Sequence, residues 1–470
     1  MKLKFRVAPS LKDKLSTQRV MRDLTIALTV VLIFSCVFYG MEYGTEYLIN
    51  IFLLLVASVV TSTVLELIFA KAMKIPYKRQ MSTSFPWVTP LILVLIMPVN
   101  TPVYAMTIAT AIAVFFGKLV YGGLGHNVFN PAGLGRAVLG VAFAGQVVED
   151  LSTAATPIGS MNSYGWLLAN ESVAGFVEQF GGWQGLLTGW HAGSLGETSF
   201  LLIILLGVFL IVREAIDWRV PVFYIATVFL CAAVVGFTGG AGIYYPIYHV
   251  VTGGVAFGAV FMLTDPVTNP THPYGRALFA VGAGVFTVLL RVNAAMPGGV
   301  VFAILFMNML SPLITRILEG NQIKTLKKAR ITMLVFVALG LGLSWLSGSN
   351  MQAQVISESP VEEISITEAD GEVTYELSSP GFVKANPNVY VITIDTATNT
   401  ITNVECTVYN DTPGYGDKAT AEDNISLYEG IVVSDVVETD VDAVSGATLT
   451  SDSIKIAVEY AIAHYNEGGQ

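Results

Sequence analysis

Residues 47–70 read YLINIFLLLVASVVTSTVLELIFA, a run of 24 residues with one charged side chain, Glu66. A helix rises 1.5 Å per residue and the hydrocarbon layer is about 30 Å thick, so about 20 apolar residues make one crossing. This run therefore predicts a membrane-spanning helix. The composition of the whole chain also indicates a membrane protein. Its 470 residues are 53% hydrophobic and 13% charged, whereas soluble domains have roughly 25% charged residues.

Ten further apolar runs accompany this one. We expect spans with cores at 25–40, 47–70, 88–98, 102–120, 129–147, 199–212, 220–237, 248–263, 277–291, 300–318 and 331–346. Two of them look interrupted, because prolines surround 88–98 and an Asn-Pro-Ala triplet opens 129–147. Broken helices persist at membrane depth only where protein or a water-lined cavity covers their backbone. The pattern predicts a polytopic helical membrane protein.

Basic residues indicate the orientation. They gather in the N-terminal stretch and in loops at 71–79, 213–219 and 316–330. Short loops rich in Lys and Arg stay in the cytoplasm, and eleven crossings put all four segments there. Residues 137–212 contain no Lys or Arg, so we expect the loop within them outside. The same parity puts the N-terminus in the cytoplasm and everything after the last span outside.

A weak internal echo suggests duplication. The peptide Thr-Asp-Pro-Val at 264–267, followed by Gly-Arg-Ala, resembles Asn-Pro-Ala at 130–132, again followed by Gly-Arg-Ala. A five-span unit repeated at about 20–150 and 199–318 would produce it. Chance matching of Gly, Pro and Arg in loops is the alternative.

Two acidic residues in the apolar region also leave alternatives open. Glu66 and Asp265 suit an ion relay, because ionisable groups within membranes are often functional. Each equally suits a helix cap or a partner for Arg276. We therefore assign no ion site from the sequence.

Charge divides the chain into two parts. Residues 347–470 contain 21 acidic residues and three lysines, a net charge of -18, while the rest carries +8. Three cysteines lie far apart, so neither a disulfide framework nor a metal clip is expected. A net charge of -10 argues against nucleic acid as a partner.

The acidic part predicts an α+β domain at 373–470, after an acidic linker at 351–372. Runs rich in β-branched residues predict strands at 373–378, 389–394, 401–409 and 430–437. A closing helix is indicated by helical spacing of apolar residues, with Ser451 as its cap. The residues so spaced are Ile454, Ala457, Val458, Ala461 and Ile462.

Two features of this domain suit a phosphorylated ligand. Residues 412–418, TPGYGDK, predict a turn in which Pro413 presets one angle and Gly414 takes a positive one, so backbone can approach a flat ligand. Thr448 lies just before the closing helix, where free N–H groups and the helix dipole favour an anion. From the spacing alone, a helix cap without a ligand is the alternative.

Two stretches share one frame. Residues 150–156 read DLSTAAT and residues 442–448 read DAVSGAT, each with Asp, two residues, a hydroxyl residue, a small residue, alanine and threonine. Both are predicted outside the cytoplasm. A chance repeat has no reason to respect topology, so the frame marks Thr156 and Thr448 as sites of the same chemistry.

The frame resembles the signal for covalent flavinylation, in which a flavin transferase joins FMN through its phosphate to the threonine hydroxyl. With TPGYGDK, residues from about 373 to 468 resemble the FMN-binding domain of the Rnf complex G subunit and of the C subunit of the sodium-pumping NADH:quinone reductase. The resemblance implies FMN on Thr448. The other residues it implies at this site are Asp442, Ser445, Gly446, Ala447, Thr412, Pro413, Gly414 and Tyr415.

Residues 1 to about 325 resemble the D subunit of the Rnf complex, related to the B subunit of the sodium-pumping reductase. The matching peptides are STQRVM at 16–21, FNPA at 129–132, STAATP at 152–157 and TDPV at 264–267. The resemblance implies a urea-transporter-like fold of about ten helices in two repeats. It also implies a second FMN on Thr156, with Asp150 in its signal.

Two features depart from these families. Ala154 stands where the soluble signal has glycine, and a D subunit does not usually carry a fused FMN domain. We expect five segments: a cytoplasmic stretch at 1–24, a membrane domain at 25–325, a basic loop and anchor helix at 326–350, the linker, and the FMN domain.

The resemblance implies an electron-transfer subunit of an ion-translocating ferredoxin:NAD+ oxidoreductase in a bacterial inner membrane. It implies no complete active site in this chain. Its partners would be Rnf subunits of the A, B, C, E and G types, a flavin transferase, and sodium or protons. A non-covalent riboflavin is left open.

Two other functions also stay open. A urea-transporter-type channel with a redox appendage predicts a hydrophilic tunnel and no flavin on Thr156. A stand-alone flavinylated protein, passing electrons to an external acceptor, predicts purification without partner subunits.

Overall fold

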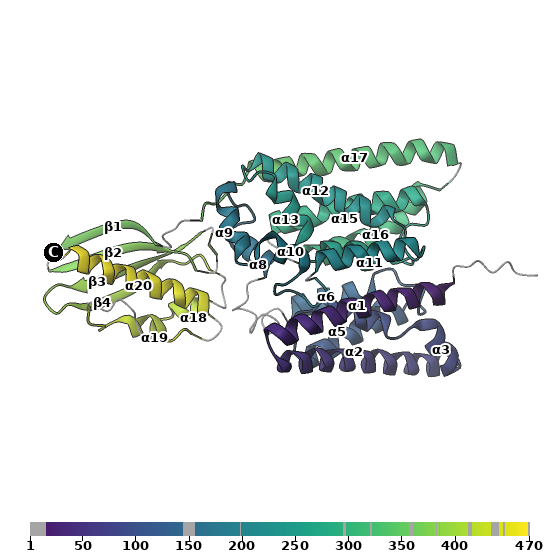
Figure 1. The fold of residues 1–470 in the computed structure, drawn as a ribbon, viewed down its shortest axis with the longest axis horizontal. Coiled ribbons are helices and arrows are strands. Elements are labelled where there is room, and N and C mark those ends of the chain that lie inside the picture. Colours follow the sequence, from purple (N-terminus) through teal and green to yellow (C-terminus); the bar gives the residue numbers. More distant parts are fainter. Residues whose placement is uncertain are drawn as a thin grey trace, which may run out of the picture. The chain divides into compact units, whose positions relative to one another are not determined.

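The structure is a computed structural model in which the chain forms two compact units. It describes residues 16–143, 156–197, 199–294, 298–319, 322–356, 361–369, 371–381, 383–384, 386–411, 416–433, 441–444 and 447–468. One unit, here the membrane unit, comprises Met1–Ile158 and Val173–Met351. The other, here the C-terminal unit, comprises Gly159–Ser172 and Gln352–Gln470. Figure 1 shows the helices of the first and the sheet of the second.

Among the described residues, six helices of the membrane unit are long and apolar enough to cross a bilayer. They are α1 (Thr17–Glu42), α2 (Thr45–Ala72), α12 (Arg219–Thr238), α15 (Pro273–Ala294), α16 (Gly299–Ile317) and α17 (Gln322–Ser349). Helices α12, α15 and α17 pack against one another (Figure 1). Large apolar side chains such as Ile33, Phe52 and Leu334 remain exposed on the long helices, as expected of surfaces that face lipid.

Other expected spans are short or broken. They correspond to α4 (Val88–Leu95), α5 (Val103–Val114) with π-helix η1 (Phe115–Leu119), α6 (Pro131–Ala142), α11 (Phe200–Val212), and the series α13 (Tyr244–Val251), α14 (Val255–Phe257) and π-helix η3 (Gly258–Met262). A 12-residue helix such as α6 is only about 18 Å long. The sequence predicted interruptions near 88 and 129, and both regions hold short helices.

The break between α13 and α14 was not expected, because the sequence there predicted one span over 248–263. The two halves meet at a 60° bend. Gly253 lies in this bend with φ +69, a conformation open to glycine at little cost. The sequence did not reveal this break because residues 248–263 contain no Asp, Glu, Lys, Arg or Pro. Only Thr252, Gly253 and Gly254 interrupt the apolar side chains at this point.

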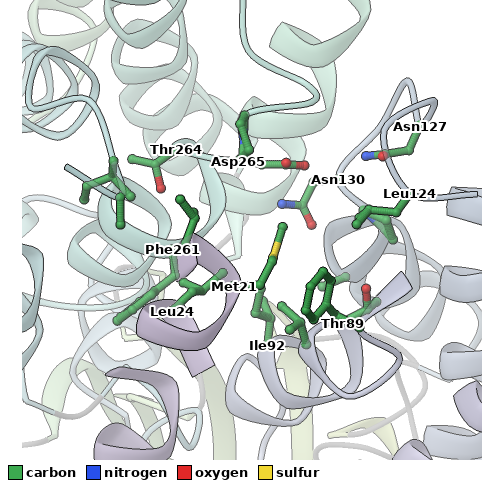
Figure 2. Close-up of a pocket in the computed structure, with 18 of the residues that line it drawn as sticks. Met21, Leu24, Thr89, Ile92, Leu124, Asn127, Asn130, Phe261, Thr264 and Asp265 are labelled. Carbon is green, nitrogen blue, oxygen red and sulfur yellow. The ribbon is translucent and has the colours of Figure 1, made fainter. Parts of the chain in front are cut away.

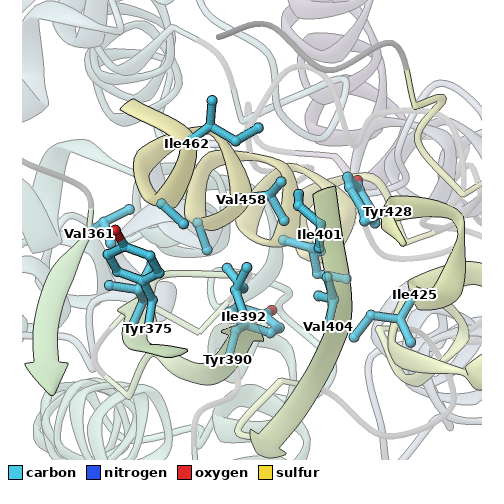
Figure 3. Close-up of a cluster of buried hydrophobic side chains, with 14 of the residues drawn as sticks. Val361, Tyr375, Tyr390, Ile392, Ile401, Val404, Ile425, Tyr428, Val458 and Ile462 are labelled. Carbon is cyan, nitrogen blue, oxygen red and sulfur yellow. The ribbon is translucent and has the colours of Figure 1, made fainter. Parts of the chain in front are cut away.

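The C-terminal unit is an antiparallel sheet covered by one long helix. The strands are β1 (Glu362–Ala369), β2 (Glu372–Ser379), β3 (Asn388–Asp395) and β4 (Thr400–Val408), in the order β1-β2-β3-β4. Helix α20 (Thr448–Gly468) lays its apolar stripe on the sheet. Figure 3 shows Val458 and Ile462 above Ile392. The five apolar positions predicted for this helix all belong to the buried core.

Three details of this unit differ from the sequence expectations. Strand β1 lies inside the segment predicted as linker. The sequence missed it because all its residues are exposed, so no alternation of apolar and polar residues marks it as a strand. Residues 430–433 contribute only an isolated bridge between Thr400 and Val432, and 434–440 lie outside the described residues. Helix α20 starts at Thr448, so Ser451 is not its cap; the Ser451 hydroxyl accepts from the Val444 N–H at 3.0 Å.

An insert from the first half of the chain completes the C-terminal unit. Residues 159–172, here called the insert, pair with residues 352–356. The Ala169 N–H donates to the Gln354 carbonyl at 2.7 Å, and the Gln354 N–H donates to the Leu167 carbonyl at 2.8 Å. The Lys384 ammonium lies 3.2 Å from the Tyr164 hydroxyl. The start of the predicted linker is therefore held in place.

Candidate functional site

The first turn of α20 is tied to the turn motif by a buried carboxylate. Asp411, just before the motif, accepts from Thr450 Oγ1 at 2.7 Å, from the Val383 N–H at 2.9 Å and from Asn388 Nδ2 at 3.0 Å. A buried charge is tolerated when donors of this kind satisfy it. Because Thr450 lies two residues after Thr448, these bonds hold Asp411, the residue before the motif, beside the start of α20.

The other end of the motif meets the same helical turn. A Cβ atom on Gly416 would lie 2.4 Å from Thr450 Oγ1 and 2.7 Å from the Tyr409 hydroxyl, so only glycine fits there. Burial, with the carboxylates of Asp411 and Asp417 nearby, raises the pKa of Tyr409 to about 12, and its phenol stays neutral. Both flanks of residues 412–415 therefore converge on the first turn of α20.

The structure places the predicted site residues unevenly. Ala447 is buried in the core and Asp442 is exposed, while Thr448 is the first residue of α20. The predicted residues outside the described part of the chain are Asp150, Thr412, Pro413, Gly414, Tyr415, Ser445 and Gly446.

A buried polar network supports this corner and was missed from the sequence. The Tyr390 hydroxyl donates to Ser453 Oγ at 3.2 Å, and Ser453 Oγ donates to the Ser379 carbonyl at 3.0 Å. Asn388 Oδ1 accepts from the Asn410 N–H at 2.8 Å. Buried polar groups fully paired in this way fix a unique geometry. The available signal was polar residues at the ends of apolar strands.

Thr156 also directly precedes a helix. It is half-buried, and α8 (Pro157–Ser163) begins at the next residue. The Tyr248 hydroxyl donates to the Pro157 carbonyl, and Ile158 packs against Gly253 in the break of the α13–α14 span. The segment that follows Thr156 is thereby anchored on a discontinuous helix.

The two loops with similar sequences meet at one cavity. Figure 2 shows Asn127, Asn130 and Asp265 on one side of it and apolar side chains such as Met21 on the other. Asn130 caps α6 and its Nδ2 donates to the Met262 carbonyl at 3.3 Å. The cavity volume is about 70 Å³, enough for a few water molecules.

The structure gives Glu66 and Asp265 local partners. Glu66 Oε1 lies 2.7 Å from Lys118 Nζ, and both side chains are buried. Gln80 Nε2 also donates to Glu66, at 2.6 Å. Asp265 Oδ1 accepts from the Val267 N–H at 3.1 Å. Neither acid is the partner of Arg276, which lies 3.0 Å from Asp217 instead. Glu66 pairs with a lysine, and Asp265 accepts within its own turn and does not cap a helix.

Comparison with known proteins identifies both parts of the chain. Residues 4–324 match the NQR2, RnfD, RnfE family and residues 385–463 match the FMN-binding domain. The chain belongs to the NQR2, RnfD, RnfE family. The resemblance inferred from the motifs is thereby confirmed.

Relatives in this family belong to ion-translocating complexes. The D subunit of the proton-translocating ferredoxin:NAD(+) oxidoreductase complex of Clostridium ljungdahlii is 34% identical over 284 residues, 58% of this chain and 83% of that protein. The D subunit of the Na(+)-translocating complex of Acetobacterium woodii is 31% identical over 268 residues, 55% of this chain and 78% of that protein. The B subunit of the Na(+)-translocating NADH-quinone reductase of Chromohalobacter salexigens is 34% identical over 243 residues, which are 51% of this chain and 59% of that protein.

Proposed function

We propose that this chain is an electron-transfer subunit of an Rnf-type ion-translocating ferredoxin:NAD+ oxidoreductase and carries covalent FMN on two threonines. The observation that carries the proposal is the convergence of both flanks of residues 412–415 on the helical turn that begins at Thr448, in a chain whose relatives include D subunits of such complexes. The FMN would supply one- and two-electron transfer, and the protein would hold and tune it.

The residues around Thr448 fit a phosphate ester. The first N–H groups of a 21-residue helix have no intrahelical acceptor, and the helix dipole favours an anion there. The Asp411–Thr450 bond keeps this turn rigid. Gly416 leaves no side chain between the motif and the helix. Residues 412–415 would then lie against the flavin itself.

Thr156 is the second attachment site in this proposal. Its frame matches that of Thr448 at every fixed position except that Thr153 stands for Ser445 and Ala154 for Gly446. The anchored segment at 157–158 fits a fixed attachment point. Asp150 would serve the transferase as Asp442 does in the other frame.

The orientation proposed is N-terminus in the cytoplasm, with both threonines and the C-terminal unit outside. Ion pairs support it by gathering basic helix ends together. Arg213, which ends α11, lies 2.9 Å from Asp23 near the start of α1, and Arg276 at the start of α15 lies 3.0 Å from Asp217. Such basic segments stay in the cytoplasm.

A duplicated unit is also part of the proposal. In the first half, short helix α4 is followed by α5, π-helix η1 and the proline that opens α6. In the second half, short helix α13 is followed by α14, π-helix η3 and the proline that opens α15. The matching order of these irregular elements favours a repeat over chance matching of loops.

The remaining partners follow from the relatives. Subunits of the A, B, C and E types would provide the ferredoxin and NAD sites, and a G-type subunit would be replaced or supplemented by the fused domain. A flavin transferase would attach both FMN groups. Sodium or protons would be the translocated ion, and the riboflavin left open by the sequence would be a further cofactor.

One experiment ranks this function against its rivals. The chain is produced with a flavin transferase, denatured, and examined for fluorescence in a gel, beside Thr156→Ala, Thr448→Ala and the double variant. We expect each single variant to keep part of the signal and the double variant to lose it. A channel with a redox appendage keeps no signal in Thr448→Ala. Purification of a flavinylated chain without other subunits would favour the stand-alone protein.

A further inference from the structure

A buried arginine occupies the break in the α13–α14 span. Arg291, in the last turn of α15, is fully buried. Its Nη1 donates to the His249 carbonyl at 2.9 Å and its Nη2 to the Thr252 carbonyl at 3.3 Å. These carbonyls belong to the end of α13, where a helix carries partial negative charge. Capping this broken end is one role of Arg291.

Capping leaves polar atoms in this cluster unsatisfied. Within the part of the chain that the structure describes, Arg291 Nε and the Tyr245 hydroxyl are buried and have no hydrogen-bond partner. Both residues are fully buried. Orphaned buried donors are costly, because the desolvation of each is not repaid. Arg291 Nε and the Tyr245 hydroxyl could therefore each donate a hydrogen bond to an additional acceptor.

The charge of this cluster is also unbalanced. Glu197 Oε1 would lie 2.5 Å from a Cβ on Gly254, in the same break. This carboxylate lies within range of the electrostatic field of two guanidinium groups, those of Arg136 and Arg291. Among the described residues named here, two positive charges face one negative charge. A surplus of positive charge in a low-dielectric site acts strongly on any neighbouring anion.

The positively charged Arg291 and the segment that follows Thr156 meet at the same glycine, Gly253. A Cβ on Gly253 would be 2.8 Å from both Arg291 Nη2 and Ile158 Cγ1. The Tyr248 hydroxyl, from the same helix α13, donates to the Pro157 carbonyl. Thr156 directly precedes Pro157, so the backbone reaches the first of these contacts one residue after the proposed attachment point.

We propose that Arg291 is a positioning residue that sets the reduction potential of the flavin on Thr156. The inference rests on the proposed attachment of FMN there. Reduction of a flavin by two electrons with uptake of one proton leaves one negative charge on its ring. A buried guanidinium nearby stabilises that charge. Arg291 thus raises the potential of this flavin, so that it passes electrons on only to a partner of still higher potential.

The test is a redox titration of the chain in its native complex with Thr448→Val, so that Thr156 carries the flavin. A mediator dye poised with dithionite supplies the electrons. Arg291→Gln is expected to lower the midpoint potential, while Arg291→Lys, which keeps the charge, changes it less. The matched control is Arg276→Gln, in the first turn of the same helix and paired with Asp217, which is expected to leave the potential unchanged.

A second variant covers a failure of Arg291→Gln to fold. Glu197→Gln removes the facing carboxylate and is expected to raise the potential, the opposite direction. Equal potentials in the parent and in both variants overturn the inference while the attachment stands. Absence of covalent flavin from the Thr448→Val chain overturns the attachment at Thr156 and the inference with it.

Discussion

The regions around Thr156 and Thr448 carry one sequence frame in opposite electrostatic surroundings. The segment after Thr156 packs on a break that holds the buried Arg291. The turn that begins at Thr448 is held by the buried carboxylate of Asp411, in a part of the chain with a net charge of -18. In the proposed function, a shared attachment signal therefore leaves the fold free to tune the potential of each flavin separately.

The largest effect is expected from removing one hydroxyl. Thr448→Ala should abolish flavin in the C-terminal unit, because the proposed phosphate ester forms on the threonine that ends the frame, and should leave one flavin on Thr156. Intact-mass spectrometry with peptide mapping locates the remaining flavin. Thr450→Ser, which keeps a hydroxyl able to bond Asp411, is the control. Two flavins in Thr448→Ala would contradict the assignment.

The next largest effect is expected from removing the Asp411 carboxylate, which holds the first turn of α20. Asp411→Ala leaves three donors without an acceptor, and we expect a loss of about 3 kcal/mol in unfolding free energy. Flavin on Thr448 should fall while flavin on Thr156 is retained. Urea unfolding and peptide mapping measure the two results. Glu429→Ala, at an exposed position, should change stability by less than about 0.5 kcal/mol.

A smaller effect separates the two potentials. Negative surroundings stabilise the oxidised flavin, which carries less negative charge, so the flavin on Thr448 should have the lower potential. Titrating Thr156→Val and Thr448→Val chains one at a time measures each flavin alone. Neutralising the exposed Asp417, which flanks residues 412–415, should narrow the difference between the two potentials. An identical potential after neutralisation removes this hypothesis.

The smallest effect reports the local field near Asp411. Burial, followed by the charges of Asp411 and Glu405, raises the pKa of Cys406 from 9.0 to about 11. At pH 8 its thiolate fraction should be about 100-fold lower than that of an ordinary cysteine, and its alkylation correspondingly slower. The rate should rise as the pH approaches 11. Asp411→Asn lowers the pKa and should speed labelling at pH 8, followed by mass spectrometry.

The sequence predicted what depends on local pattern. The helical spacing of Ile454, Val458 and Ile462 predicted α20. Long apolar runs predicted the six long helices described in the membrane unit. Turn chemistry at 395–400 announced the hairpin, in which Asp395 Oδ1 accepts from the Ala397 N–H at 2.8 Å. Each of these signals is complete within one helix or one strand pair.

Features that depend on distant partners were not predictable in this way. Asp411 is one acidic residue among many until Thr450 and Asn388 are brought to it. Strand β1 shows no alternation because neither face is buried. The role of Arg291 depends on carbonyls 42 and 39 residues away. Sequence reasoning singled out both threonines but neither of the charged groups that distinguish their surroundings.

The insert carries a consequence for biogenesis. Ser172 Oγ accepts from the Ile356 N–H at 2.8 Å across 184 residues of chain, so its pairing edge is synthesised long before its partner emerges. Contacts of such long sequence separation form late. The C-terminal unit can therefore complete its folding only after helix α17 and residues 352–356 have been synthesised. A gene fragment beginning at residue 352 would encode a domain that lacks one of its own pieces.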